Sequence, residues 1–216
     1  MNIVIGVPVR DIKAYSIGRW LKAISLLDWP DPIPIIAVDN TDDTEQGKFA
    51  TFFDTKVTEA GVISNQNPIT LITVKDVYGL GSEPRLAKAR EAMRLKLIEL
   101  KADVWFSIEC DVIPPPETLR VLTPYLNTFD CIRHEYPDRD VKTQTVNGIG
   151  CGLFSRTIFN SFSFLENGGY GQGIDPLEPN CLHGGDGWLM TRIRRAGFKM
   201  ADFGNLVALQ HLGESE

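Results

Sequence analysis

The sequence predicts an α/β domain built on a mostly parallel central sheet, and three observations lead to this prediction. Apolar, β-branched segments alternate with segments of helical periodicity through the first half of the chain. The segment at residues 3–9, Ile-Val-Ile-Gly-Val-Pro-Val, is continuously apolar, which is typical of a strand buried on both faces of a parallel sheet. Acidic residues follow the predicted strands, at the edge where the carboxyl ends of parallel strands meet and where α/β domains bind ligands.

The first half of the chain contains seven predicted elements in alternation. After the strand at 3–9, the apolar residues of 15–27 recur at intervals of three and four, as in an amphipathic helix. Another helix follows Ser82-Glu83-Pro84, which combines a capping hydroxyl, an acid and an early proline, and it extends to Leu100. The other elements of this half are strands at 33–38, 69–74 and 104–108 and a helix at 49–60.

The second half of the chain is less regular. Its predicted elements are helices at 117–125 and 186–195 and strands at 130–134, 146–154 and 206–209. Glycines at 148, 150 and 152 indicate that a ligand or another backbone comes close to the strand at 146–154. Residues 163–185 contain many glycines and prolines, so we expect a loop there that is either a functional lid or disordered.

Length and composition exclude several classes of protein. A chain of 216 residues corresponds to one large domain, or to one domain with a long insertion. The 22 basic and 28 acidic residues give a net charge of -6, which argues against nucleic acid as the main partner. No apolar run reaches the roughly 18 residues of a transmembrane segment, and the N-terminus lacks the basic region of a signal peptide. The four cysteines, at 110, 131, 151 and 181, fit no zinc motif. Since there is no signal peptide, we expect free thiols and a cytoplasmic protein, with two disulfides as the alternative.

Carboxylates gather at the predicted ligand edge without a matching basic cluster, which predicts a hard divalent cation, Mn²⁺ or Mg²⁺. Glu109 and Asp111 are the sharper signal, because they follow a buried strand and alternate residues of an extended chain point to one side. The alternative for this pair is a strand end that breaks into solvent. Asp39, with Asp42 and Asp43 after it, forms a second acidic group, whose alternative is a solvated turn.

Two residues late in the chain have both a functional and a structural interpretation. His211 follows the predicted strand at 206–209; it either completes a carboxylate metal site or is a packed or surface residue. Asp186 stands at a predicted helix start after two glycines; it is either a general base for a substrate hydroxyl or an N-cap. His134 and His183 are assigned to the surface of a strand and of a loop.

Seven segments in a fixed order carry a family resemblance. They are Ile-Val-Ile-Gly-Val-Pro-Val at 3–9, Val38-Asp39-Asn40-Thr41, Leu86-Ala87-Lys88-Ala89-Arg90, Glu109-Cys110-Asp111-Val112, Gly148-Ile149-Gly150-Cys151-Gly152, Gly185-Asp186 and His211. In order and spacing, over about residues 3–211, the chain resembles GT-A-type glycosyltransferases, close to the large family 2 group. The resemblance implies a single GT-A, Rossmann-like domain over 1–216, with a nucleotide-binding half at 1–112 and an acceptor-binding half at 113–216.

The resemblance also implies a role for each matched residue. Pro8, Val9 and Arg10 would border the nucleotide, and Asp39 would contact its base or ribose. Asp111 would hold Mn²⁺ or Mg²⁺ on the donor diphosphate, with Glu109 near the ribose or the metal and His211 as the late metal ligand. Asp186 is similar to the aspartate that takes the acceptor's proton in inverting members. The chain departs from the family at Glu109, where the family usually has Asp, and at Gly185, where it commonly has Glu.

The function implied by the resemblance is metal-dependent transfer of a sugar from a nucleoside diphosphate sugar to an acceptor hydroxyl, with inversion if Asp186 is the base. The acceptor is a sugar, glycan, lipid or protein. Two alternatives stay open. A sugar nucleotidyltransferase usually has a glycine-rich basic loop after the first strand, whereas residues 8–13 here lack glycine. A nucleotide-sugar-binding protein without catalysis is the other alternative.

Overall fold

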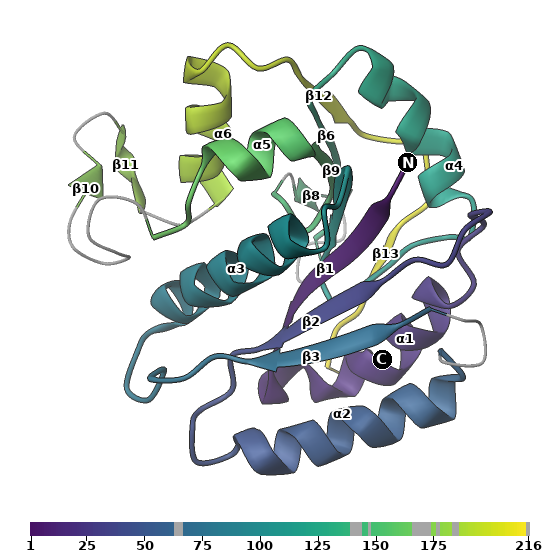
Figure 1. Cartoon of the computed structure of the whole chain (residues 1–216), viewed down its shortest axis with the longest axis vertical. Coiled ribbons are helices and arrows are strands. Elements are labelled where there is room, and N and C mark those ends of the chain that lie inside the picture. Colours follow the sequence, from purple (N-terminus) through teal and green to yellow (C-terminus); the bar gives the residue numbers. More distant parts are fainter. Residues whose placement is uncertain are drawn as a thin grey trace.

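The computed structural model contains a seven-stranded mixed sheet with helices on both faces (Figure 1). The strand order is β12-β6-β9-β4-β1-β2-β3. The structure describes residues 1–62, 67–138, 144–146, 148–165, 174–175, 178–182 and 186–214; the side chains of 83, 145–146, 174–175 and 178–182 are not among those described. The α/β class and the mostly parallel sheet predicted from the sequence are confirmed.

Four parallel strands from the first half of the chain form one side of the sheet. They are β4 (Val104–Ile108), β1 (Ile3–Val9), β2 (Ile35–Asp39) and β3 (Ile69–Thr73). β1 pairs with β4 on one side and with β2 on the other, and β2 pairs with β3. Every residue of β2 and β4 is buried, and so is every residue of β1 except the half-buried Pro8. These strands are therefore covered on both faces, as their uninterrupted apolar sequences predict.

The second half of the chain completes the sheet and departs from the prediction in two places. β9 (Cys151–Ser155) runs antiparallel between β4 and β6 (Cys131–His134), and β12 (Met200–Phe203) lies parallel to β6. The predicted strand at 146–154 is interrupted by bends, so that β8 (Thr145–Val146) is separate from β9. The predicted strand at 206–209 is wrong, because strands occur on either side of it, as β12 and β13 (Gln210–His211).

Helices cover the two faces of the sheet in separate groups (Figure 1). α1 (Ala14–Ile24), α2 (Gln46–Ala60) and α4 (Thr118–Leu122) lie on one face, and α3 (Ser82–Glu99), α5 (Arg156–Ser161) and α6 (Asp186–Arg195) on the other. Side chains of β1 alternate between the two cores, since Ile3 and Ile5 pack with α1 and α2 while Val4 packs with α3. The helix predicted at 117–125 is shorter: α4 ends and a 3₁₀ turn over Thr123–Asn127 follows, because Pro124 has no N–H to continue the helical bonds.

Three short antiparallel pairs lie outside the main sheet. β5 (Val112–Ile113) pairs with β13, and β7 (Tyr136–Pro137) pairs with β8. β10 (Ile174–Asp175) pairs with β11 (Glu178–Leu182), so part of the predicted loop at 163–185 is a small ribbon. The lid predicted there falls mostly on 166–173, 176–177 and 183–185, which lie outside the described residues, as does His183.

Two further predictions concern membrane segments and cysteines. Over the part of the chain that the structure describes, no helix is both long enough and apolar enough to cross a membrane. Cys110, Cys131 and Cys151 are buried and free, as predicted, whereas the Cys181 side chain lies outside the described residues. Burial raises the pKa of the Cys110 thiol to about 12, which keeps it protonated at neutral pH.

Candidate functional site

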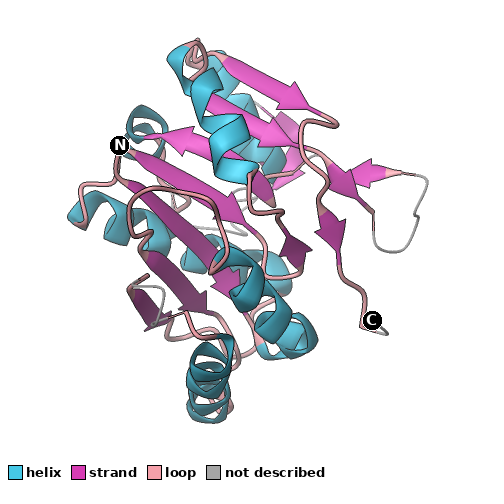
Figure 2. Cartoon of the chain, turned by 90° about the vertical axis from the view of Figure 1, so that its right-hand side faces the viewer, coloured by secondary structure: helices cyan, strands magenta, loops and turns pink. Residues whose placement is uncertain are grey.

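The carboxyl ends of the central strands bring the predicted site residues together. Val9 lies beside Asp39 in the β1–β2 register, and β4 ends one residue before Glu109. Figure 2 shows the central strands pointing toward the same side of the molecule as the C-terminal segment. That segment contains β13, and its pairing with β5 places His211 opposite Val112. Residues that are distant in the sequence therefore meet at one edge of the sheet.

A cluster of four charged or titratable side chains forms where β4 ends. Lys13, at the end of a 3₁₀ turn over Asp11–Lys13, places its Nζ 3.0 Å from Glu109 Oε2 and 3.0 Å from each Asp111 oxygen. His211 Nε2 lies 3.5 Å from Asp111 Oδ2, which exceeds the range of a good hydrogen bond. The Asp111 side chain is 0% exposed. Glu109 and Asp111 thus converge on the Lys13 ammonium. They do so from a turn and not from the extended chain predicted for them, since the Val112 N–H donates to the Glu109 carbonyl at 3.0 Å.

The electrostatics of this cluster follow from burial and from the charges in contact. Burial raises the pKa of Asp111, but His211 and Lys13 outweigh it and bring the value down to about 2. Burial lowers the pKa of Lys13, but the carboxylates of Glu109 and Asp111 raise it overall. For His211 burial again lowers the pKa, and the adjacent Asp111 carboxylate raises it overall. At neutral pH the cluster therefore contains an ionised Asp111 bound by a Lys13 ammonium.

The donor atoms of Asp111 and His211 fit a divalent cation. His211 Nε2 is buried and makes no hydrogen bond. Adjacent ligands of an octahedral ion, each about 2.1 Å from it, lie about 3.0 Å apart. The 3.5 Å between His211 Nε2 and Asp111 Oδ2 therefore needs only a small closing movement for both atoms to reach one ion. Over the described residues, no group of three or more His, Cys, Asp or Glu side chains is placed to hold a metal by itself. Phosphate-bound Mg²⁺, however, usually takes only one or two protein carboxylates, because phosphate and water supply its other ligands.

Asp39 provides a buried acceptor atom at the end of β2. Its side chain is buried, Oδ1 accepts the Thr41 N–H at 2.8 Å, and Oδ2 has no hydrogen-bond partner. Burial raises the pKa of this carboxyl above its usual range, and the Thr41 hydrogen bonds offset only part of the effect. An unpaired buried acceptor is costly unless a ligand donates to it. This position suits the N–H of a base or the hydroxyl of a ribose.

The end of β1 lies next to Asp39, as the nucleotide-binding prediction requires. Pro8 and Val9 pair with Val38 and Asp39. Arg10 follows with an extended backbone; its buried Nε makes no hydrogen bond and lies 3.5 Å from Asp11 Oδ1. The N–H of Asp11 donates to Thr41 Oγ1 at 3.1 Å, which ties the loop after β1 to the loop after β2.

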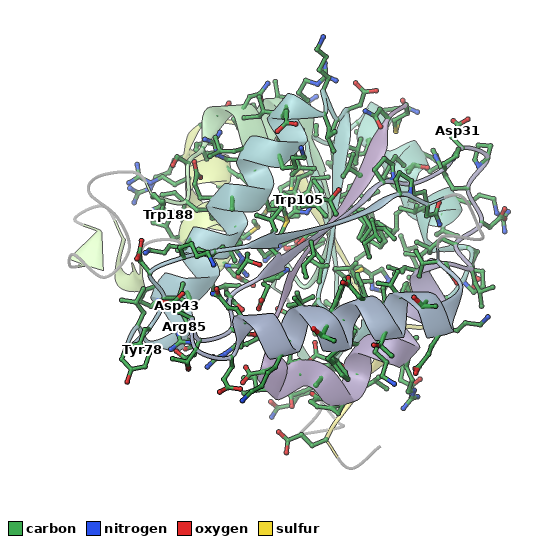
Figure 3. All side chains as sticks on the ribbon, turned by 60° about the horizontal axis from the view of Figure 1, so that its bottom comes forward. Asp31, Asp43, Tyr78, Arg85, Trp105 and Trp188 are labelled. Carbon is green, nitrogen blue, oxygen red and sulfur yellow. The ribbon has the colours of Figure 1, made fainter. Side chains whose placement is uncertain are left out.

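Asp42 and Asp43 bind protein groups beyond β2. Arg85, from α3, donates to Asp42 Oδ1 at 2.5 Å and to the Leu80 carbonyl at 2.8 Å. Asp43 accepts from the Gln46 amide and from the Tyr78 N–H. Figure 3 shows Asp43, Arg85 and Tyr78 grouped at one corner of the molecule. These two aspartates connect the β2 loop to α2 and α3, which favours the turn interpretation for them.

Asp186 begins α6, which confirms the predicted helix start. Its Oδ1 lies 2.5 Å from Arg90 Nη2, and its Oδ2 accepts the Ile149 N–H at 2.8 Å. The Arg90 side chain is 3% exposed and that of Asp186 is 33% exposed. Burial raises the pKa of Asp186, but the Arg90 charge and the Ile149 hydrogen bond lower it below its usual range. Asp186 is therefore an ionised carboxylate with both oxygens bound.

The 148–150 segment connects the two acidic centres. The Glu109 N–H donates to the Gly150 carbonyl at 2.8 Å, while the Ile149 N–H donates to Asp186. A Cβ on Gly148 would collide with Asp186 Oδ2, and one on Gly150 would collide with the Tyr136 hydroxyl. Gly152 approaches a backbone atom, with its hypothetical Cβ 2.7 Å from the Ile132 carbonyl. The approach of another backbone predicted from the glycines is confirmed at Gly152, whereas side chains come close to Gly148 and Gly150.

Sequence reasoning missed the basic partners of these carboxylates. The premise of an acidic edge without matching cations is wrong, because Lys13 binds Glu109 and Asp111, and Arg90 binds Asp186. Lys13 gave no local signal, since a 3₁₀ turn aims it at residues far along the chain. Arg90 stands within the α3 segment used for the family resemblance, but a basic residue on an amphipathic helix is ordinarily solvent-facing.

Sequence reasoning also missed Tyr136 and assigned His134 wrongly. Burial raises the pKa of Tyr136, and the charges of Glu109, Asp186 and Asp111 raise it further, so its hydroxyl lies among the site carboxylates. His134, predicted at the surface, is 1% exposed. Its Nε2 accepts the N–H groups of Leu206 and Val207 at 3.0 and 3.1 Å. The apolar segment at 206–209 is therefore anchored through an imidazole instead of a strand ladder.

Comparison with known proteins gives matches at the level of structure. No family model and no curated protein matches the sequence. The mannosyltransferase PcManGT from Pyrobaculum calidifontis, in complex with GDP-Man and Mn²⁺, matches with a TM-score of 0.63 and 16% identity over 96% of this chain and 56% of that one. Glucosyl-3-phosphoglycerate synthase from Mycobacterium tuberculosis, in complex with phosphoglyceric acid, matches with a TM-score of 0.54 and 14% identity over 98% and 72% of the two chains.

A third match is TarS 1–349 from S. aureus in complex with UDP, with a TM-score of 0.52 and 11% identity over 74% of this chain and 48% of that one. The chain thus spans about half the length of the mannosyltransferase and of TarS 1–349. At these identities the similarity is one of fold. The chain has the fold of GT-A glycosyltransferases, which confirms the fold implied by the order of its motifs.

Proposed function

We propose that this chain is a glycosyltransferase that moves a sugar from a nucleoside diphosphate sugar to an acceptor hydroxyl with the help of Mn²⁺ or Mg²⁺. One observation carries the proposal. The unpaired Asp39 Oδ2 and the Asp111–His211 pair are both buried at the carboxyl edge of the same parallel strands, where α/β folds bind nucleotides. Neighbours of the same fold contain GDP-Man with Mn²⁺, or UDP, which supports the same class of donor here.

The donor would extend from the end of β2 to the end of β4. Asp39 Oδ2 accepts a hydrogen bond from the base or ribose, and Pro8, Val9 and Arg10 border the nucleotide. Asp111 and His211 hold the divalent cation, with Glu109 beside it. When bound, such a cation supplies Lewis-acid charge that stabilises the leaving diphosphate.

Asp186 takes the acceptor's proton in this proposal, as in an inverting reaction. A carboxylate has about four lone-pair sites, and Arg90 and Ile149 use two of those on Asp186. A third of the side chain is exposed, so an acceptor hydroxyl has access to the remaining sites. The lowered pKa makes Asp186 a weak base, which places its contribution toward the lower end of general-base catalysis.

Calorimetry with GDP or UDP, with and without Mn²⁺, tests the donor site. Asp111→Asn removes a full ligand charge, so we expect at least a tenfold loss of metal-dependent affinity, about 1.4 kcal/mol. Asp54→Asn is the matched control, because Asp54 is an exposed residue of α2. Equal affinity in Asp111→Asn and the parent would contradict the metal assignment.

Product analysis separates the proposed reaction from the two alternatives. With a nucleoside diphosphate sugar and a panel of hydroxyl acceptors, a glycosyltransferase releases nucleoside diphosphate and a glycosylated product. A nucleotidyltransferase instead forms pyrophosphate from a nucleoside triphosphate and a sugar phosphate. A binding protein gives tight metal-dependent donor binding without turnover of either substrate pair.

A further inference from the structure

Lys13 occupies the space between the two carboxylates next to the proposed metal position. Its Nζ is 3.0 Å from Glu109 Oε2 and 3.0 Å from both oxygens of Asp111. Asp111 Oδ2 also faces His211 Nε2, at 3.5 Å. The same carboxylate oxygen is therefore shared by an ammonium ion and by the atom that completes the proposed metal-ligand pair.

The backbone of Lys13 is fixed, whereas its ammonium is exchangeable. The Lys13 N–H donates to the Arg10 carbonyl at 3.0 Å, and the Ser16 hydroxyl donates to the Lys13 carbonyl at 2.8 Å. The side chain is 25% exposed, and a lysine ammonium is a compact charge on a flexible four-carbon stem. Its contacts with the carboxylates can be broken by rotations about the stem, without any change in the fold.

We infer that Lys13 is an internal counter-ion that competes with the divalent cation for Asp111. An ammonium and a divalent cation on one carboxylate repel each other, so the ion binds well only after Lys13 has moved away. The freed ammonium lies beside the diphosphate position and can bind its oxygens. Metal and nucleoside diphosphate then favour each other's binding, since coupling between two ligands is reciprocal. The metal half of this inference concerns residues of the chain alone, and only the diphosphate half rests on the proposed function.

Lys13→Gln tests the competition directly, with Mn²⁺ alone as the probe. Glutamine removes the charge but keeps a polar side chain that can donate to a carboxylate. Measured by electron paramagnetic resonance without nucleotide, Mn²⁺ affinity should increase at least about tenfold, within the usual range of coupling between sites. Lys56→Gln is the control, because Lys56 pairs with Glu59 near the C-terminal end of α2 and not with the site carboxylates. Unchanged or weaker Mn²⁺ binding by folded Lys13→Gln overturns the inference.

A second measurement uses the unmodified protein, in case the variant does not fold. Amine acylation followed by mass spectrometry reports how accessible each lysine is. Saturating Mn²⁺ should increase labelling of Lys13 several-fold, because the ammonium leaves the carboxylates, and it should leave Lys56 unchanged. Constant or reduced labelling of Lys13 in the presence of Mn²⁺ overturns the inference.

Nucleotide binding distinguishes a failure here from a failure of the proposed function. With Mn²⁺ present, Lys13→Gln should bind GDP or UDP more weakly than the parent does, although it binds Mn²⁺ alone more tightly. A lysine with only a structural role is not expected to raise one of these affinities and lower the other when it is replaced. If the parent binds neither nucleotide, the proposed function fails, while tighter Mn²⁺ binding by Lys13→Gln still supports the counter-ion role.

Discussion

Two aspartates of the candidate site are paired with cations of different kinds. Asp111 contacts the ammonium of Lys13, and Asp186 contacts the guanidinium of Arg90. A lysine ammonium is a rotatable point charge, whereas a guanidinium is a rigid planar donor that is less easily displaced. The first pair is therefore suited to exchange its cation, and the second is suited to keep it.

The surroundings of the two pairs support the same distinction. Asp111 lies 3.5 Å from an imidazole nitrogen that makes no hydrogen bond, so an alternative cation ligand is already in place. Asp186 is bound on its second oxygen by the Ile149 N–H, and Gly148 leaves only enough room for this contact. Similar carboxylates can thus serve as an exchangeable ligand or as a fixed group, depending on the neighbouring donors.

The largest expected effect is on sugar transfer by Asp186→Asn. Asparagine cannot take a proton, so transfer should fall by at least about 10²-fold while donor affinity stays close to that of the parent. The loss lies toward the lower end of the range for a general base, because the pKa of Asp186 is lowered. The change also leaves Arg90 without its counter-ion, at a cost of about 1–3 kcal/mol, less than for a fully buried pair because Asp186 is 33% exposed. Rates and circular dichroism should therefore be recorded at a temperature where the variant is folded.

Arg90→Gln is the matched comparison for this prediction. It removes the same ion pair but keeps the carboxylate, and the pKa of Asp186 should rise. If Asp186 is the base, transfer persists and the acid limb of the pH–rate profile shifts upward. Equal loss of transfer in both variants, in step with their loss of stability, would show that Asp186 only anchors α6.

Gly148→Ala should disturb the Asp186–Arg90 pair and lower the free energy of unfolding by about 3 kcal/mol. This is toward the upper end of the cost of overpacking a site. The added Cβ meets Asp186 Oδ2, which must leave the Ile149 N–H. Urea unfolding measures the change. Gly47→Ala is the control, because nothing lies within 4 Å of its Cβ and alanine favours a helix, so stability should stay constant or increase. A Gly148→Ala protein as stable as the parent would mean that the contact with Asp186 is loose.

The smallest expected effect is a gradual loss of stability in acid. Asp111 and Asp186 both have depressed pKa values in the folded state, that of Asp111 being about 2. Each contributes stability that is present above the unfolded pKa of about 4 and is lost as the pH falls through the folded value. We expect Asp111 to account for on the order of 2 kcal/mol of the free energy of unfolding between about pH 4 and pH 2. Chemical denaturation at several pH values gives the free energy of unfolding as a function of pH. Between about pH 2 and pH 4 this free energy should change less steeply in Asp111→Asn than in the parent; an equally steep change would contradict this linkage.

Residues whose environment is local were predictable from the sequence. The strand at 3–9 follows from a continuous apolar run, and the helix near Ser82 begins where the sequence predicts it. The predicted cap is wrong, because Gly81 stands at the N-cap position of α3 and makes no side-chain cap hydrogen bond. Asp39, Glu109 and Asp186 were found because the sequence places them at a strand end or a helix start. In the structure Asp39 is the last residue of β2, Glu109 directly follows β4, and Asp186 begins α6. The fold class follows from the same patterns, since alternating strands and helices have few arrangements that bury both faces of a sheet.

Contacts between distant segments were decided only by the tertiary structure. Lys13 and Glu109 are 96 residues apart in the sequence, and so are Arg90 and Asp186. No pattern within a segment specifies which cation meets which carboxylate, because that depends on strand register and on the turns between elements. His211 reaches Asp111 through the β13–β5 pairing, in a region where the sequence predicted a different strand. The chain's own sequence thus determined the acidic edge, and packing determined that one of its carboxylates holds an exchangeable lysine and another a fixed arginine.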